Sequence, residues 1–184
     1  MTYIYKNIKS AVNTGSGIAE FMLIAPVVAF TEGGIQAPAA PFDLQPEGQQ
    51  VQILTPHEFK PGLGFAKILF APEKNSLSAK TIGDLMFQKQ DFELKGFIPG
   101  SSAILHEAFF NWVNTPLIAL TKDSNCPANM WYQLGNDCTS AFLKGDFTTG
   151  TTKDGVKGYD VTLSWQNPFV QLYAHVDGPE ILAD

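Results

Sequence analysis

The chain has 184 residues, of which 45% are apolar, and it carries a formal net charge of −6 at pH 7. This size and apolar content suffice for one sizeable hydrophobic core, so we expect a single domain over residues 1–184. All twelve basic residues are scattered lysines. Because arginine best matches phosphates and base edges, its absence from an acidic chain argues against sequence-specific nucleic-acid binding.

An apolar run over residues 18–30 follows a segment that contains Lys6 and Lys9. Glu20 interrupts the run, Pro26 breaks it, and no small-residue cleavage site follows, so an export signal is not favoured. At roughly 14 residues the run is also too short to cross a bilayer. We therefore expect a buried strand at 21–30, preceded by an N-terminal arm at 1–16, and no membrane partner.

The Pro- and Gln-rich segment 36–50 separates this strand from the next strand pattern. Loops of this length in compact domains usually carry a function or become ordered when they bind a partner. We expect this loop to take part in assembly, with Phe42 and Leu44 as apolar contact residues.

Strand patterns bounded by Gly, Pro, Asn or Asp recur along the whole chain. Together with a single helix they predict a mainly β protein with the architecture of an antiparallel sandwich or barrel. Residues 166–184 are expected to form a C-terminal tail. The strand patterns cover residues 21–30, 49–55, 64–71, 91–98, 116–122, 130–134, 141–149 and 158–165.

The helix is expected between residues 101 and 114. Ser101 or Ser102 can cap its free amides, and Pro116 prevents it from continuing. Phe110 lies away from the apolar stripe, so it is either a solitary exposed side chain or a contact with a neighbouring subunit. The stripe that we expect to pack on a sheet consists of Leu105, Ala108, Phe109 and Trp112, widened by Ile104 and Val113.

Residues 141–165 have the pattern of a long β-hairpin around a turn at Lys153, Asp154 and Gly155. In the second strand, apolar side chains alternate with polar ones, which predicts a strand with one buried and one wet face. Asp146 and Asp160 fall on the polar side of the hairpin. The alternating apolar residues are Tyr159, Val161, Leu163 and Trp165.

No common catalytic motif is present, and no metal or other cofactor is expected. Cys126 and Cys138 flank a predicted strand, so we expect them to be reduced apolar fillers rather than a disulfide. The residues His57, His106 and His175 stand apart, without the spacing of a zinc site.

Two further patterns leave alternatives to a purely structural role. Asp91 and Glu93 share a strand face about 7 Å apart, as a hydrolase with paired carboxylates would need, although a solvated strand face explains them better. Trp131, Tyr132 and Trp165 could form a sugar-binding platform, but alternation places Trp165 on the core side.

Several short motifs occur in an order that resembles the tail tube proteins of long-tailed bacteriophages. GDFTTG and KGYDVTL, followed by Asn-Pro, are similar to the closing hairpin of those proteins. FELKGFIPG leads into the aromatic helix, and PLIALTKD and MWYQLG follow it. FMLIAPVVAF and GLGFAKILFAP stand where such proteins carry their first strands.

This resemblance implies a structural virion protein rather than an enzyme, with the fold of a ring-forming tail tube subunit. Its partners would be further copies of itself in a hexameric ring that stacks into a tube, other tail proteins, and DNA that passes through without specific binding. It would assemble in the host cytoplasm and reside in the virion tail. The expected subunit contacts are Phe110, Phe42, Leu44, Phe147, Thr148 and Thr149, and the expected lumen-facing residues are Asp146 and Asp160.

The alternative function is a β-sandwich carbohydrate-binding or adhesin module, which would need an export signal and exposed aromatic side chains. A hydrolase with two carboxylates ranks behind both.

Overall fold

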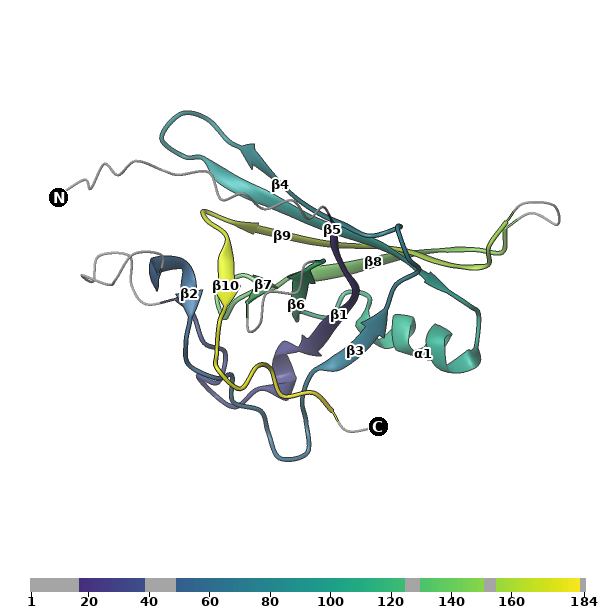
Figure 1. Ribbon diagram of the computed structural model, residues 1–184, viewed down its shortest axis with the longest axis horizontal. Helices are drawn as coiled ribbons and strands as arrows, with labels where there is room; N and C mark the ends of the chain where they lie inside the picture. The colour runs from purple at the N-terminus through teal and green to yellow at the C-terminus, as the bar shows by residue number, and fades with distance from the viewer. Residues whose placement is uncertain (1–16, 39–48, 125–129, 151–154, 183–184) are drawn as a thin grey trace.

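The computed structural model describes residues 17–38, 49–124, 130–150 and 155–182 (Figure 1). Within these ranges the chain forms two β-sheets, helix α1 (Ala103–Trp112) and two short 3-10 helices, Val27–Ala29 and Gln49–Val51. The first sheet has the order β2-β10-β7-β6-β1-β3, with β1 (Ile18–Pro26), β2 (Gln52–Ile53), β3 (Ala66–Leu69), β6 (Leu117–Asp123), β7 (Trp131–Leu134) and β10 (Gln171–Tyr173). The second has the order β4-β5-β9-β8, with β4 (Ser76–Ile82), β5 (Lys89–Pro99), β8 (Phe142–Thr148) and β9 (Gly158–Asn167).

The predicted class, mainly β with one α-helix, is confirmed, but the barrel is wrong because the two sheets remain separate. The four-stranded sheet is antiparallel throughout. The six-stranded sheet is mixed, since β10 pairs with β2 in parallel and with β7 in antiparallel orientation. The two sheets face each other, and α1 lies near one end of the four-stranded sheet (Figure 1).

The six-stranded sheet is buried on both faces. Met22 and Ile24 of β1 face the core between the sheets, whereas Leu23 and Ala25 face a second apolar cluster. Residues from the loops, including Phe30 and Phe65, cover that second face. A strand buried on both sides needs no polar alternation, which explains why β1 and β6 have nearly continuous apolar sequences.

The four-stranded sheet is buried on one face only, as the alternation in the hairpin predicts. The apolar residues of β9 are buried, while Asp160 and Ser164 between them are exposed. The predicted hairpin pairing is confirmed, because β8 and β9 pair from Phe142 opposite Ser164 to Thr148 opposite Gly158. The indole Nε1–H of Trp165 donates to the carbonyl oxygen of Thr139 at 2.8 Å, which satisfies its polar group in the core.

Two glycines let the chain after β3 and helix α1 approach the four-stranded sheet closely. Gly96 and Gly145 lie on either side of Val161 across β5, β9 and β8. A Cβ atom at position 96 would come within 2.5 Å of the Phe70 ring, and one at position 145 within 2.5 Å of the Phe109 ring. These two aromatic rings therefore occupy the space that side chains would fill in an ordinary strand, and they anchor β3 and α1 on the sheet.

Helix α1 begins where the capping pattern predicts, since the Ser102 hydroxyl accepts a hydrogen bond from the Leu105 amide. Phe109 is buried and stacks on the Tyr159 ring with a centroid distance of 3.9 Å. His106 also contacts Tyr159 by a hydrogen bond between its Nδ1 and the phenol oxygen. Ile104 and Val113 are corrections to the predicted stripe, because both side chains are exposed.

Two strands were absent from the predicted pattern, and others have different bounds. Strand β4 is mostly exposed and rich in Ser, Lys and Thr, so it gives no apolar alternation. Strand β10 lies in the segment expected to be a tail and has three residues. The predicted strand at 49–55 is a 3-10 turn followed by the two-residue strand β2, and the strand predicted at 21–30 begins at Ile18 and ends at Pro26.

A buried histidine ties the loops beneath the six-stranded sheet to its strands. The amide of Gln36 donates to Nδ1 of His57 at 3.0 Å, so Nε2 carries the proton and donates to Oε1 of Gln133 at 2.9 Å. The Gln133 amide then donates to the carbonyl oxygen of Gly135. The ring stacks on Tyr173 at 4.8 Å. Burial lowers the pKa of His57 from its usual value of 6.5, although the bond to Gln133 opposes this shift.

Gly145→Ala should reduce the free energy of unfolding by about 1–3 kcal/mol, because the new methyl group overlaps the Phe109 ring. Urea denaturation of the two single variants and of the double variant with Phe109→Leu measures the coupling between these positions. The cost of Gly145→Ala should be smaller in the Phe109→Leu background. Equal costs in both backgrounds would show that the Phe109 ring is not what the glycine accommodates.

The free energy of unfolding should decrease as the pH falls below about 6.5, down to the lowered pKa of His57 in the folded protein. The unfolded chain binds a proton on this residue in that range while the folded protein resists it. Thermal unfolding at several pH values would show the effect. His57→Gln, which remains neutral, should remove this component, whereas the control His175→Gln should retain it.

Candidate assembly surface

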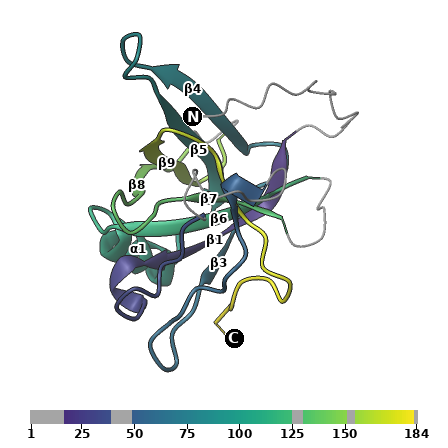
Figure 2. The ribbon, with the colours of Figure 1, turned by 90° about the vertical axis from the view of Figure 1, so that its left-hand side faces the viewer.

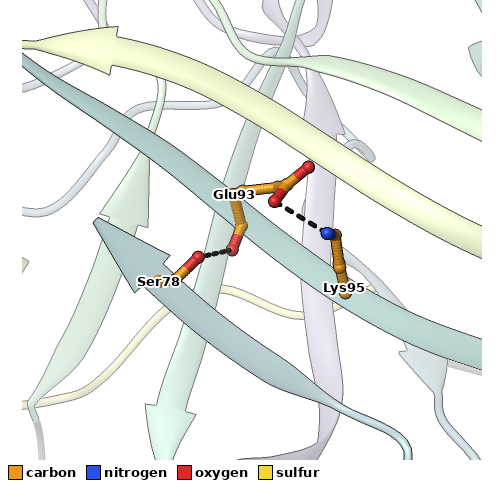
Figure 3. Close-up of polar contacts among 3 residues, drawn as sticks. All are labelled: Ser78, Glu93 and Lys95. Carbon is orange, nitrogen blue, oxygen red and sulfur yellow. Dashed lines mark hydrogen bonds and ion pairs between the residues drawn. The ribbon is translucent and has the colours of Figure 1, made fainter. Parts of the chain in front are cut away.

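The solvent-exposed side of the four-stranded sheet, here called the outward face, is made of the strand positions that alternate with the core residues. It carries Ser78 of β4 beside Glu93 of β5, and Thr162 and Ser164 of β9. Figure 3 shows its polar contacts: the Ser78 hydroxyl donates to the Glu93 carbonyl oxygen at 3.4 Å, and Lys95 Nζ lies 2.8 Å from Glu93 Oε2. Most of the outward face is therefore hydrophilic, with an exposed ion pair, but it also carries Ile82 of β4, the buried Phe97 of β5 and the half-exposed Phe142 of β8.

The charges on the outward face are balanced overall but unevenly placed. Asp146 and Asp160 lie directly opposite each other in β8 and β9, and both are exposed. Like charges in this position repel each other, and the ion pair between Lys144 and Asp146 at 3.2 Å offsets part of that cost. The outward positions hold four lysines and four acids, namely Lys80, Lys89, Lys95 and Lys144 with Asp91, Glu93, Asp146 and Asp160.

The four-stranded sheet has two open edges in the part of the chain that the structure describes. Strand β4 forms one edge and β8 the other. Figure 2 shows β4 on the outer side of its sheet, away from the six-stranded sheet. The β8 edge is covered only near its start, where Val113 makes an isolated bridge with Leu143. Unpaired edges of this kind are templates for pairing with another strand.

The residues expected at subunit contacts that the structure describes lie in two places, on α1 and at the end of β8. Phe110 is exposed on α1, as its position off the apolar stripe predicts. Phe147 is half-exposed, but its ring faces α1, with its centroid 4.9 Å from that of His106. Thr148 follows at the end of β8, where its hydroxyl accepts from the Gly150 amide, and Thr149 is next. Phe42 and Leu44 lie outside the described residues.

The patterns that suggested other functions have structural explanations. Trp131 and Trp165 are buried, so they do not form an exposed aromatic platform for a sugar. Asp91 and Glu93 do share the outward face of β5, but Glu93 is engaged by Lys95 on an open surface. Cys138 is a free thiol and is exposed, which corrects its expected role as a buried filler. Cys126 lies outside the described residues.

The most exposed group of adjacent apolar residues in the described part of the chain was not found from the sequence. Leu85, Met86 and Phe87 form the turn between β4 and β5 and are exposed together. Three consecutive large apolar residues directly after Gly83 and Asp84 could have indicated an exposed apolar turn rather than a strand. This signal was missed because β4 lacks apolar alternation, so no hairpin was expected between β4 and β5.

Comparison of the chain with protein families, curated proteins and solved structures finds no match. The described residues contain no cluster of three or more His, Cys, Asp or Glu side chains that could hold a metal ion. Among the same residues, no helix has the length and apolar character needed to cross a membrane.

Asp160→Asn should raise the free energy of unfolding by a few tenths of a kcal/mol, because it removes the repulsion from Asp146 directly opposite. Asp91→Asn is the matched control, since Asp91 lies opposite Lys80 rather than another acid. That variant should leave stability unchanged or slightly lower it. Urea denaturation at low ionic strength measures both, and a loss of stability in Asp160→Asn would contradict the repulsion.

Proposed function

We propose that this protein is the repeating ring subunit of a phage tail tube, a structural virion protein that conducts DNA during ejection. The observation that carries the proposal is the antiparallel four-stranded sheet with an open edge on each side and a mostly hydrophilic outward face. The two-sheet fold with one helix supports the resemblance in the order of motifs along the chain.

The direction of the two edge strands favours closure into a ring. Strands alternate in direction across β4, β5, β9 and β8, so β4 and β8 run in opposite directions. When a second copy is placed beside the first by rotation about an axis along the strands, its β4 therefore lies antiparallel to β8 of the first copy. Repeating this heterologous contact gives a closed ring with one continuous sheet and no unpaired edge.

In such a ring the outward face lines the channel. It carries Ser, Thr and Gln side chains and balanced charges, so it offers DNA no continuous cationic surface. Few counterions are therefore released from the DNA, and the DNA binds only weakly. Asp146 and Asp160 add a local negative charge next to the β8 edge. The role needs no catalytic group and no cofactor, and its partners are copies of the chain, other tail proteins and transiting DNA.

Proline substitution at two adjacent positions of β4 tests the edge contact. In an antiparallel edge strand, the N–H groups of neighbouring residues alternate between pointing to the partner and pointing outward. Of Ala79→Pro and Lys80→Pro, one should therefore unfold part of the β4–β5 pair. The other should keep the melting temperature but prevent ring formation, as seen by light scattering and negative-stain microscopy.

Assembly should be measured with and without seeding by preformed tails. If both proline variants form rings as well as the unsubstituted protein does, β4 is not an assembly edge. A strict monomer at every concentration, with or without seeds, would contradict the tube proposal itself.

Reversing two acids should make the channel adhere to DNA. Asp146→Lys with Asp160→Lys should change the stability of the subunit by under about 0.5 kcal/mol, because both side chains are exposed. Assembled tubes of this variant should retain double-stranded DNA at ~50 mM salt, whereas unsubstituted tubes should not. Cosedimentation measures retention, and the same change should slow genome ejection. Equal retention by both tubes would show that these acids do not face the channel.

A further inference from the structure

The turn between β4 and β5 presents an apolar finger, defined as Leu85, Met86 and Phe87. Their side chains are 85%, 95% and 82% exposed. The turn projects from one end of the four-stranded sheet (Figure 1). Three adjacent large apolar side chains held in water at the tip of a hairpin indicate a contact site rather than scattered surface residues.

The backbone of the finger is held in a conformation that its sequence does not favour. The Phe87 amide donates to the Asp84 carbonyl oxygen at 3.0 Å, which closes a tight turn. Within that turn Met86 has a φ angle of 78°, in the left-handed region that glycine adopts most easily. Keeping a large side chain at this position costs stability, and such strain is typical of positions with a function.

An apolar groove lies between α1, the end of β5 and β3. Its volume is about 540 Å³. Two of the apolar residues that line it are exposed to water: Leu69 is 62% exposed and Ile104 is 80% exposed. Lys67 also lines the groove, and its ammonium lies 4.7 Å from the centroid of the Phe21 ring. The lining also includes Pro99, Leu105 and Trp112.

The finger and the groove lie at opposite ends of the same strand. Strand β5 starts at Lys89, two residues after the finger, and ends at Pro99, which lines the groove. At about 3.3 Å per residue the strand separates them by about 30 Å. The finger cannot reach the groove of its own chain, whereas copies placed end to end along β5 bring one finger to each groove.

We propose that the finger of one copy docks into the groove of a second copy. The contact is heterologous and does not close on itself, so it extends along the strand direction without limit. Asp84 at the base of the finger is opposite in charge to Lys67, which lines the groove. This reading of the contact rests on the proposed ring assembly. There the docked finger joins one ring to the next, whereas β4 and β8 join subunits within a ring.

A crosslinking experiment tests the pairing directly. On a background with Cys126→Ser and Cys138→Ser, protein with Met86→Cys is mixed with protein carrying Ile104→Cys, under assembly conditions with a short thiol-specific crosslinker. The mixture should give covalent heterodimers. The matched control replaces Ile104→Cys by Val28→Cys, an exposed apolar position outside the groove. Equal crosslinking in both mixtures, or none in either, would overturn the proposal.

Two substitutions separate this contact from the ring itself. Met86→Gly relieves the strained φ angle, so the subunit should unfold at the same or a higher temperature. The concentration needed for tube growth should nevertheless rise about tenfold or more, because one buried large apolar side chain is worth at least that factor. Ile104→Asp should have the same effect on tube growth, and Val28→Asp should have none.

Electron microscopy then distinguishes the two proposals. With Met86→Gly, single rings should still form and only their stacking should fail. Tubes of normal length from both Met86→Gly and Ile104→Asp would overturn the docking contact and leave the ring untouched. If 86–104 crosslinks form but no rings are seen in any sample, the docking contact stands and the ring proposal fails.

Discussion

The close contact of the two layers across Gly96 and Gly145 is the constraint on which the rest of the structure depends. The ring of Phe70, which follows β3, occupies the place of a side chain at position 96. The ring of Phe109, in α1, occupies the place of a side chain at position 145. This interlock decides which face of the four-stranded sheet is inside. It also holds the helix at one end of the sheet through the stack of Phe109 on Tyr159. Every polar residue that alternates with these glycines must then face water.

The same constraint leaves the four-stranded sheet with open edges. Its inner face packs against the rest of the protein. Strands β4 and β8 are the outermost strands of the sheet, so each has one unpaired edge. The six-stranded sheet is covered on both faces. It shares no strand with the four-stranded sheet, so the two sheets do not close into a barrel. A sheet that is buried on one side, hydrophilic on the other and open at both edges suits pairing with its own copies. The proposed ring follows from this arrangement and not from any single site.

Local sequence signals predicted the elements whose physics is local. The cap at Ser102 and the alternation from Tyr159 to Trp165 depend on neighbours within a few residues, and both appear in the structure as expected. Strand β4 could not be predicted in this way. Its residues are exposed on an edge, and its strand conformation depends on pairing with β5. The parallel pairing of β2 with β10 joins segments more than 100 residues apart, which no local pattern records.

The candidate site shows the same division between local and tertiary information. Exposure of Phe110 follows from helix periodicity, whereas exposure of Ile104 results from where α1 meets the sheet. In the proposed ring, β8 of one copy continues into β4 of the next. A cryo-electron microscopy map of the assembled protein, at a resolution that separates strands, tests this most directly. We expect antiparallel pairing of β8 with β4 across every subunit boundary. An assembly in which both edges remain in solvent would contradict it.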